Sequence, residues 1–221
     1  MIEKRCGILT VCISFAVLLV ALCASPVNAH AQGVPALSFS GQGSNTASVD
    51  STRGYAFNVT AVGGVFVTGL SFYDQGGNGL SQSHEVGIWN SSGTLLASST
   101  VPAGTAAPLD SNGLFREITL ALPIFLPAGN SYAVGAFFSG GSADSQAVNW
   151  TSMATAPGIS YAEVRFVNNS STLTFPTITS SFLGLPGGSF VVSPVPEPGT
   201  LSLLGVGLVA WTVLRRRAAR G

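Results

Sequence analysis

The stretch Tyr161-Ala-Glu-Val-Arg-Phe166 decides how the central part of this chain is interpreted. Apolar and polar residues alternate along it, so an extended strand places the two kinds on opposite faces. One face holds Ala162, Val164 and Phe166, and the other holds Tyr161, Glu163 and Arg165. Alternation with a period of two predicts a half-buried β-strand.

The same period extends outward from this stretch in both directions. Ile118, Leu120 and Leu122 alternate with their neighbours, whereas residues 132–138 are apolar on both faces, which predicts a strand covered on both sides. Further strands are expected at residues 64–73, 84–89 and 94–98, and turn clusters rich in Gly, Asn, Asp and Ser lie at residues 76–79, 90–93, 110–113 and 128–130. No sustained helical pattern occurs between residues 36 and 193. An antiparallel β-sandwich, either a jelly roll or an immunoglobulin-like arrangement, is therefore predicted, and the strand order is not readable.

Charge is sparse and unevenly distributed along the 221 residues. Only 8% of the residues are charged, against about 25% in typical domains. Residues 32–194 hold three basic and seven acidic residues, a net charge of −4. The basic residues are Arg53, Arg116 and Arg165, and the acidic ones are Asp50, Asp74, Glu85, Asp110, Glu117, Asp144 and Glu163. This balance excludes nucleic-acid binding, which needs a basic face to displace counterions.

The first 31 residues are typical of an export signal. A charged start with Lys4 and Arg5 precedes an uncharged apolar run over residues 7–24, and Ala29-His30-Ala31 fits the small-x-small site of signal peptidase. We expect cleavage after Ala31, and an uncleaved membrane anchor is the alternative. All three cysteines, Cys6, Cys12 and Cys23, lie in this segment, so the exported chain is expected to carry no disulfide, thiolate metal site or cysteine nucleophile.

The last 27 residues have three parts in a fixed order. Pro196-Glu197-Pro198 comes first, an uncharged run over residues 199–214 follows, and Arg215-Arg216-Arg217 closes it. As a helix the run reaches about 24 Å, a little less than the hydrocarbon core of a bilayer. The arginines are expected to stay cytoplasmic by the positive-inside rule. The prolines keep the segment around Glu197 extended, which suits a protease at the membrane surface.

This arrangement closely resembles the PEP-CTERM sorting signal of Gram-negative bacteria. The resemblance implies that the chain is a substrate of exosortase, an integral-membrane cysteine protease or transpeptidase, in a system associated with exopolysaccharide and biofilm. A plain C-terminal anchor with an accidental Pro-Glu-Pro is the alternative. Taken together, these patterns predict a signal peptide (1–31), an exported β-sandwich (32–194) and a sorting signal with one membrane helix (195–221).

The central domain also resembles an uncharacterised type of β-sandwich module from secreted bacterial proteins. The matching stretches are Val67-Thr-Gly-Leu-Ser-Phe-Tyr73, Val86-Gly-Ile-Trp-Asn-Ser-Ser-Gly-Thr-Leu-Leu-Ala97, Pro127-Ala-Gly-Asn-Ser-Tyr-Ala-Val134 and Thr174-Phe-Pro-Thr177. The resemblance implies a fold and a secreted context but no chemistry.

Candidate site residues in the central domain are few. His84 is the only histidine certain to remain after signal cleavage, and the sequence offers it no second histidine or cysteine for a metal site or a catalytic triad. Asp74, Asn78 and Glu85 give an oxygen-rich loop that is a candidate for calcium, although it does not match an EF-hand, and a hydrogen-bonded turn is the alternative. Trp89 and Trp150 are candidates for stacking on sugar rings, with burial in the core as the alternative.

Two hypotheses of function follow. The first is a non-enzymatic envelope or extracellular-matrix protein without a cofactor, exported, held briefly in the inner membrane, cut near Glu197 and released, in association with exopolysaccharide or biofilm. Its expected partners are signal peptidase, exosortase and the inner membrane. The second is a secreted carbohydrate-binding module or carbohydrate-active enzyme, which glycan binding or turnover by the purified domain would reveal.

Overall fold

The computed structural model describes residues 33–180, 184, 186–194, 205, 207–208 and 211. The predicted signal peptide and the motif Pro196-Glu197-Pro198 with Arg215, Arg216 and Arg217 lie outside the described residues. Of the predicted membrane helix only Gly205, Gly207, Leu208 and Trp211 are described, and their backbone is helical. Within the described part of the chain, no helix is long and apolar enough to cross a membrane.

The described domain is all-β, as the alternation predicts. Its elements are β1 (Val34–Pro35), β2 (Leu37–Ser40), β3 (Gly43–Thr46), β4 (Ser51–Val59), β5 (Val65–Tyr73), the 3₁₀ turn η1 (Gln75–Gly77), β6 (His84–Asn90), β7 (Leu95–Val101), β8 (Phe115–Leu126), β9 (Ser131–Phe138), β10 (Ser145–Val148), β11 (Ser152–Thr155), β12 (Ile159–Asn168), β13 (Ile178–Ser180) and β14 (Gly188–Pro194). The strands expected near residues 64–73, 84–89, 94–98 and 132–138 are confirmed within a few residues.

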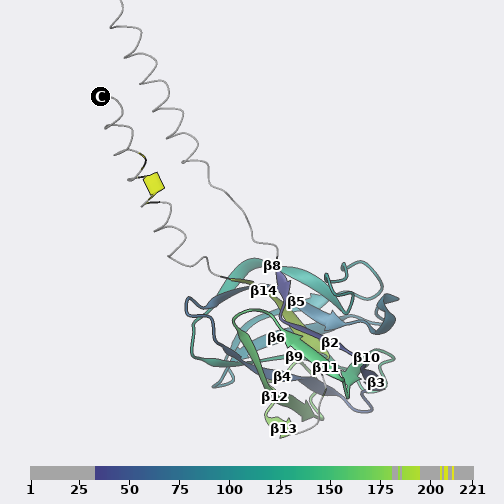
Figure 1. The fold of residues 1–221 in the computed structure, drawn as a ribbon. Helices are drawn as coiled ribbons and strands as arrows, with labels where there is room; N and C mark the ends of the chain where they lie inside the picture. Colours follow the sequence, from purple (N-terminus) through teal and green to yellow (C-terminus); the bar gives the residue numbers. More distant parts are fainter. Residues whose placement is uncertain are drawn as a thin grey trace, which may run out of the picture. The chain divides into compact units, whose positions relative to one another are not determined.

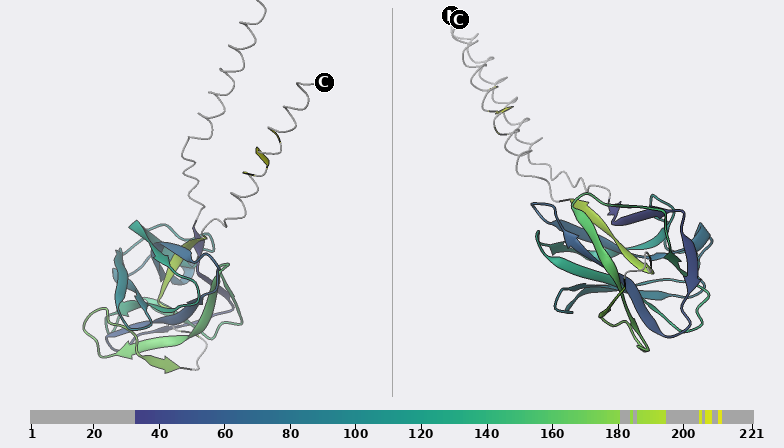
Figure 2. Two further views of the ribbon diagram at one scale, coloured as in Figure 1. Left: turned by 90° about the vertical axis from the view of Figure 1, so that its left-hand side faces the viewer. Right: turned by 60° about the horizontal axis from the view of Figure 1, so that its bottom comes forward.

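Two antiparallel sheets face each other. One has four strands in the order β1-β14-β5-β8, and the other has six in the order β13-β12-β4-β9-β6-β7. Two small sheets, β10-β3 and β11-β2, complete the domain. In Figure 1 the four-stranded sheet lies in the upper part of the domain and the six-stranded sheet below it, and Figure 2 shows the layers from two further sides. This is the layer arrangement of a β-sandwich.

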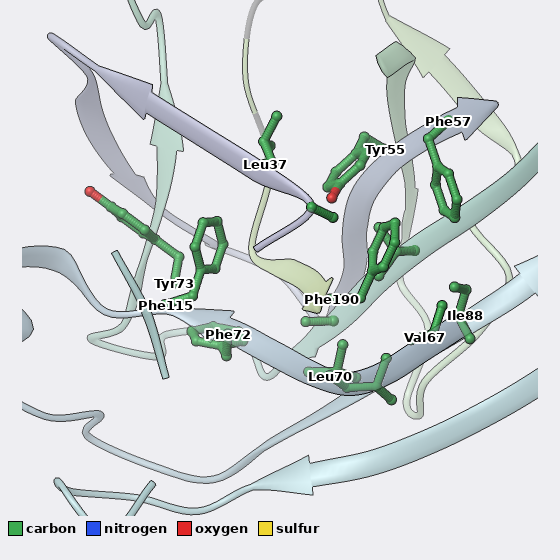
Figure 3. Close-up of a cluster of buried hydrophobic side chains, with 14 of the residues drawn as sticks. Leu37, Tyr55, Phe57, Val67, Leu70, Phe72, Tyr73, Ile88, Phe115 and Phe190 are labelled. Carbon is green, nitrogen blue, oxygen red and sulfur yellow. The ribbon is translucent and has the colours of Figure 1, made fainter. Parts of the chain in front are cut away.

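Aromatic side chains from both sheets fill the space between them. Phe190 of β14 and Phe57 of β4 are fully buried, with ring centroids 4.5 Å apart. Figure 3 shows Phe190 between the aromatic residues of β4 and the side chains of Val67 and Leu70 on β5. Burying one such side chain contributes about 1.5–3 kcal/mol, so this seam of inward residues holds the two sheets together.

The face of the six-stranded sheet that points away from the core is covered as well. Residues 169–177 cross it, where the backbone N–H of Thr174 donates to Thr52 Oγ1 at 3.0 Å and Phe175 packs edge-on against Trp89. Ala133 and Val134 of β9 are consequently both buried, although they point to opposite faces. The expectation that residues 132–138 are covered on both sides is confirmed.

The alternation that predicts β12 breaks at one position. A bulge between Tyr161 and Glu163 interrupts the pairing with β4, so Tyr161 packs on Tyr55 at 5.6 Å in the core. Glu163 and Arg165 do lie together and form an ion pair at 2.6 Å. The prediction that Tyr161 shares their face is wrong, because the extra residue of a bulge reverses the order of faces on one side of it.

The two ends of the sandwich carry different connections. Gly33 and Pro194 lie at one end, which we call the terminal end; its connections are residues 60–64, 91–94, 127–130 and 156–158. Hydrogen bonds tie these turns together, with Gly129 N–H donating to Val59 O at 2.9 Å and Thr60 N–H to Gly158 O at 2.8 Å. The opposite end, which we call the acidic end, carries residues 47–50, 74–83, 102–114 and 139–144.

Candidate functional site at the acidic end

His84 begins β6 and is buried at the acidic end, with 1% of its surface exposed. Its ring stacks on Phe72 with centroids 3.7 Å apart and an interplanar angle of 8°. Nδ1 lies 2.9 Å from the carbonyl oxygen of Phe137, and Nε2 lies 2.8 Å from Asp144 Oδ2. The carbonyl and the carboxylate are both acceptors, and together they engage both ring nitrogens of His84.

Asp144 lies at the end of the connection between β9 and β10 and gathers donors from a second loop. It accepts hydrogen bonds from the backbone N–H of Ser81 at 2.7 Å, the Ser81 hydroxyl at 2.7 Å and the N–H of Gln82 at 3.1 Å. Burial alone raises the pKa of this carboxyl, but the hydrogen bonds from Ser81, His84 and Gln82 outweigh it and hold the pKa below its ordinary value. The carboxylate is therefore stabilised in its ionised form.

The chemistry of this cluster follows from which atoms are occupied. A serine nucleophile needs its hydroxyl on an imidazole nitrogen that is free to accept the proton. Here both nitrogens of His84 are engaged, and the Ser81 hydroxyl donates to Asp144 instead. The arrangement fastens the loop of residues 74–83 to the loop of residues 139–144.

A second buried pair fastens the same loop to a third one. Arg116 Nε lies 2.7 Å from Asp74 Oδ2, and both side chains are almost fully buried. The guanidinium also donates to the carbonyl oxygens of Ala107 at 2.7 Å and Gly77 at 2.9 Å, while Asp74 accepts the N–H of Gly79 at 2.9 Å. One arginine thus organises both the loop of residues 74–83 and the loop of residues 102–114.

This pair bears directly on the calcium hypothesis. Arg116 supplies the positive charge beside Asp74 that a calcium ion would bring, and Asn78 and Glu85 are exposed to solvent. Among the described residues, no group of three or more His, Cys, Asp or Glu side chains is arranged to hold a metal ion. The loop is organised by an arginine where the sequence interpretation placed a metal.

Comparison with known families gives two matches. A family described as a domain of unknown function (DUF4082) matches residues 40–182, which is more than half of the chain. The chain belongs to the DUF4082 family. A second family model, the PEP-CTERM protein-sorting motif, matches residues 194–217 and so includes the Pro-Glu-Pro and the arginine cluster. Comparison with curated proteins and with solved structures gives no match.

The two matches confirm both resemblances seen in the sequence. In this DUF4082 chain the sandwich and the sorting motif adjoin, because β14 ends at Pro194 and the motif match begins there. The PEP-CTERM match supports export of the chain and exosortase-dependent sorting at its C-terminus.

The proposed sugar-stacking residues need a correction in this DUF4082 domain. Trp89 does lie on the outer face of its sheet, but Phe175 covers it at 6.1 Å and only 3% of it is exposed. Trp150 stacks on Phe39 at 5.3 Å and is equally enclosed. Neither indole presents a face to a sugar, so the stacking prediction is wrong for both. Phe175 covers Trp89 on the outer face of its sheet, and Trp150 belongs to the hydrophobic core.

The partners of His84 and Arg116 were not identifiable from the sequence. Asp144 stands 60 positions from His84, and Asp74 stands 42 positions from Arg116. Within residues 32–194, seven acidic residues were available to three arginines and one histidine, and nothing in their spacing selects these pairs. The scarcity of charge was itself the available signal, because an isolated charge in a chain this apolar is costly to bury unless it is paired.

Proposed function

We propose that this chain is a non-enzymatic protein of the cell envelope or extracellular matrix. The signal peptide directs export, residues 199–214 hold the chain in the inner membrane, and exosortase cuts near Glu197 and frees the sandwich. Association with exopolysaccharide or biofilm is part of the proposal. The observation that carries it is the position of the motif, since Pro196 follows the last strand by two residues.

The position of the cut supports release of an intact domain. Pro194 is the last residue of β14 and pairs with Val65 of β5. A cut near Glu197 leaves every described strand on the released side. Among the described residues, the core cluster contains none from the predicted anchor of residues 199–214.

The chemistry of the acidic end supports the non-enzymatic part of the proposal. Both nitrogens of His84 and the carboxylate of Asp144 are engaged in loop contacts within the domain. The Arg116–Asp74 pair is similarly enclosed. Buried polar side chains with a structural role are usually hydrogen-bonded to other parts of the protein, as these groups are.

The test replaces Pro196-Glu197-Pro198 by three alanines in the native host. We expect the variant to keep its anchor, resist processing and accumulate at full length in the membrane fraction, as wild type does in a strain without exosortase. Removing Arg215 to Arg217 is the matched change at the other side of the helix. It should weaken the membrane stop and release unprocessed chain, because each arginine costs about 2.5–3.5 kcal/mol to move into hydrocarbon.

Mass spectrometry of both termini reads the result. If the triple-alanine variant is trimmed and released like wild type, the motif is not the recognition element and the sorting proposal fails. Matrix enrichment of the released domain supports the envelope role. Turnover of a glycan by the purified domain, lost on replacement of an acidic residue, would contradict the non-enzymatic role.

A further inference from the structure

An exposed apolar patch lies at the terminal end, on the outer face of the four-stranded sheet. Phe66 of β5 and Phe125 of β8 are cross-strand partners with ring centroids 5.2 Å apart, and they are 38% and 49% exposed. The Phe125 ring lies over Gly64, in the turn that carries Val62, which is 96% exposed. We call Val62, Phe66 and Phe125 the terminal patch. Clustered exposed aromatic and aliphatic side chains mark interaction surfaces on soluble domains.

The patch lies beside the point where the chain leaves the sandwich. Ser193 is the strand partner of Phe66, and Pro194 is the partner of Val65. Four residues, 195–198, separate Pro194 from the apolar run that begins at Gly199. Even fully extended, the five steps from residue 194 to residue 199 span at most about 18 Å. A chain anchored through residues 199–214 therefore cannot hold the patch far from the lipid headgroups.

The distribution of charge agrees with this orientation. The turns at residues 60–64, 91–94, 127–130 and 156–158 contain no Asp, Glu, Lys or Arg. Asp50, Asp74, Asp110 and Asp144 all lie in connections at the opposite end. Bringing a carboxylate to a bilayer costs desolvation and repulsion from anionic lipids, whereas an uncharged apolar end meets neither cost. Signal cleavage after Ala31 would add one α-amino group near Gly33, which anionic headgroups attract.

We infer that the terminal patch docks on the outer surface of the inner membrane while the chain is anchored, with the acidic end pointing away. The inference rests on the anchored intermediate of the proposed function. Three side chains bind lipid weakly by themselves, but the tether makes the contact intramolecular and raises its effective concentration. Docking lays residues 195–198 along the membrane surface, where a membrane-embedded protease works. Cutting the tether removes the effective concentration, and the domain leaves the membrane.

The test places one fluorophore at each end of the full chain. Cys6, Cys12 and Cys23 are first replaced by serine, and Val62→Cys or, as the matched control, Ser111→Cys is labelled with an environment-sensitive dye. Both positions are exposed, so neither label disturbs the core. The chains are reconstituted in vesicles of phosphatidylethanolamine with a minority of phosphatidylglycerol, with and without brominated acyl chains. We expect a blue shift and loss of emission on brominated lipid for the Val62→Cys label alone.

Carbonate extraction of the same vesicles separates the two proposals. If the chain is extracted, the anchored intermediate of the proposed function fails. If the chain resists extraction but the Val62→Cys label is no more quenched than the Ser111→Cys label, anchoring stands and docking is overturned. If the emission of the Val62→Cys label shifts to the blue only when exosortase is added, the patch contacts that protein. That result would overturn docking on lipid. Quenching that disappears in the Phe66→Ser/Phe125→Ser variant, and persists in an Ile178→Ser control, supports docking through the patch.

Discussion

The two ends of the sandwich differ in the length of their strand connections and in the contacts that hold these connections in place. The acidic end has long loops, and buried polar fasteners hold them: His84 with Asp144, and Arg116 with Asp74. The terminal end has short turns without charged residues. Gly93 and Gly129 in these turns have φ of 83° and 75°, a conformation that glycine adopts without strain. Buried ionic side chains fix the long loops of the acidic end, whereas the short turns are fixed by backbone hydrogen bonds and by uncharged local contacts, such as those of Asn90 Oδ1 with the N–H groups of Ser92 and Thr94.

This comparison predicts the largest loss of stability from Arg116→Met at the acidic end. The change leaves Asp74 buried without its cation, and removing one partner of a buried pair costs about 3–5 kcal/mol. Urea unfolding of the domain of residues 32–194 measures it. The control is the double variant Arg116→Met/Asp74→Leu, which should recover part of the loss. A single variant as stable as wild type would show that the pair does not hold the loops.

His84→Ala should come next, at about 2–4 kcal/mol, because it removes a stacked ring and takes one donor from a buried carboxylate. Thermal unfolding gives the loss. Sorting and any binding activity should be retained below the melting temperature, since the side chain fastens loops and its nitrogens are occupied. A hydrolytic activity abolished by this change would contradict that role.

Acid should loosen the acidic end before the terminal end. Folding lowers the pKa of Asp144, so its contribution to stability is present above the ordinary value of 3.8 and is lost as the pH falls through the lowered folded-state pKa. Asp144→Asn should flatten the dependence of unfolding free energy on pH in that range. Glu85→Gln, at an exposed position near the same end, serves as the control. Equal acid sensitivity of wild type and Asp144→Asn would show that protonation of Asp144 does not cause the loss of stability in acid.

Val62→Ser at the terminal end should change stability by no more than about 0.5 kcal/mol, because an exposed side chain away from any fastener contributes little. The same urea titration measures it beside the Arg116→Met variant. A loss comparable to that of the acidic-end variants would mean that the terminal turn is not fixed by its backbone alone.

Reducing agent should have the smallest effect, which is none. All three cysteines lie in the first 31 residues, so in the domain of residues 32–194 neither end can be fastened by a disulfide. Melting curves with and without reductant, recorded by far-ultraviolet dichroism, check this. A shift of the melting temperature on adding reductant would contradict this prediction. A helical dichroism spectrum would contradict the β-sandwich fold.

The sequence predicted what depends on local pattern. Alternation and turn residues located most of the long strands, including β5, β6 and β9, because side-chain direction in a strand follows directly from position. The order β13-β12-β4-β9-β6-β7 was not predictable, since each of its pairings except β6-β7 and β12-β13 joins strands that are not consecutive in the chain. The single extra residue at the bulge of β12 made the prediction wrong for Tyr161, which lies on the core face and not on the face of Glu163 and Arg165.

The polar contacts at the acidic end were unpredictable for a related reason. Whether Asp144 meets His84 depends on how β5, β6 and β9 stack, which no local spacing encodes. Trp89 is a second example of a contact between distant segments that the local sequence does not predict. Its outward direction was correct, but its burial depends on Phe175, far along the chain and outside any regular strand.

The place of β14 in its sheet has a consequence for the order of events during export. This strand lies between β1 and β5, so the four-stranded sheet stays open until residues 188–194 arrive. In a chain that crosses the membrane from its N-terminus, those residues arrive after every other described strand and immediately ahead of the sorting motif. The core therefore closes at nearly the same time as the sorting motif reaches the membrane. A chain truncated before β14 would keep an unpaired sheet edge and would lack the motif.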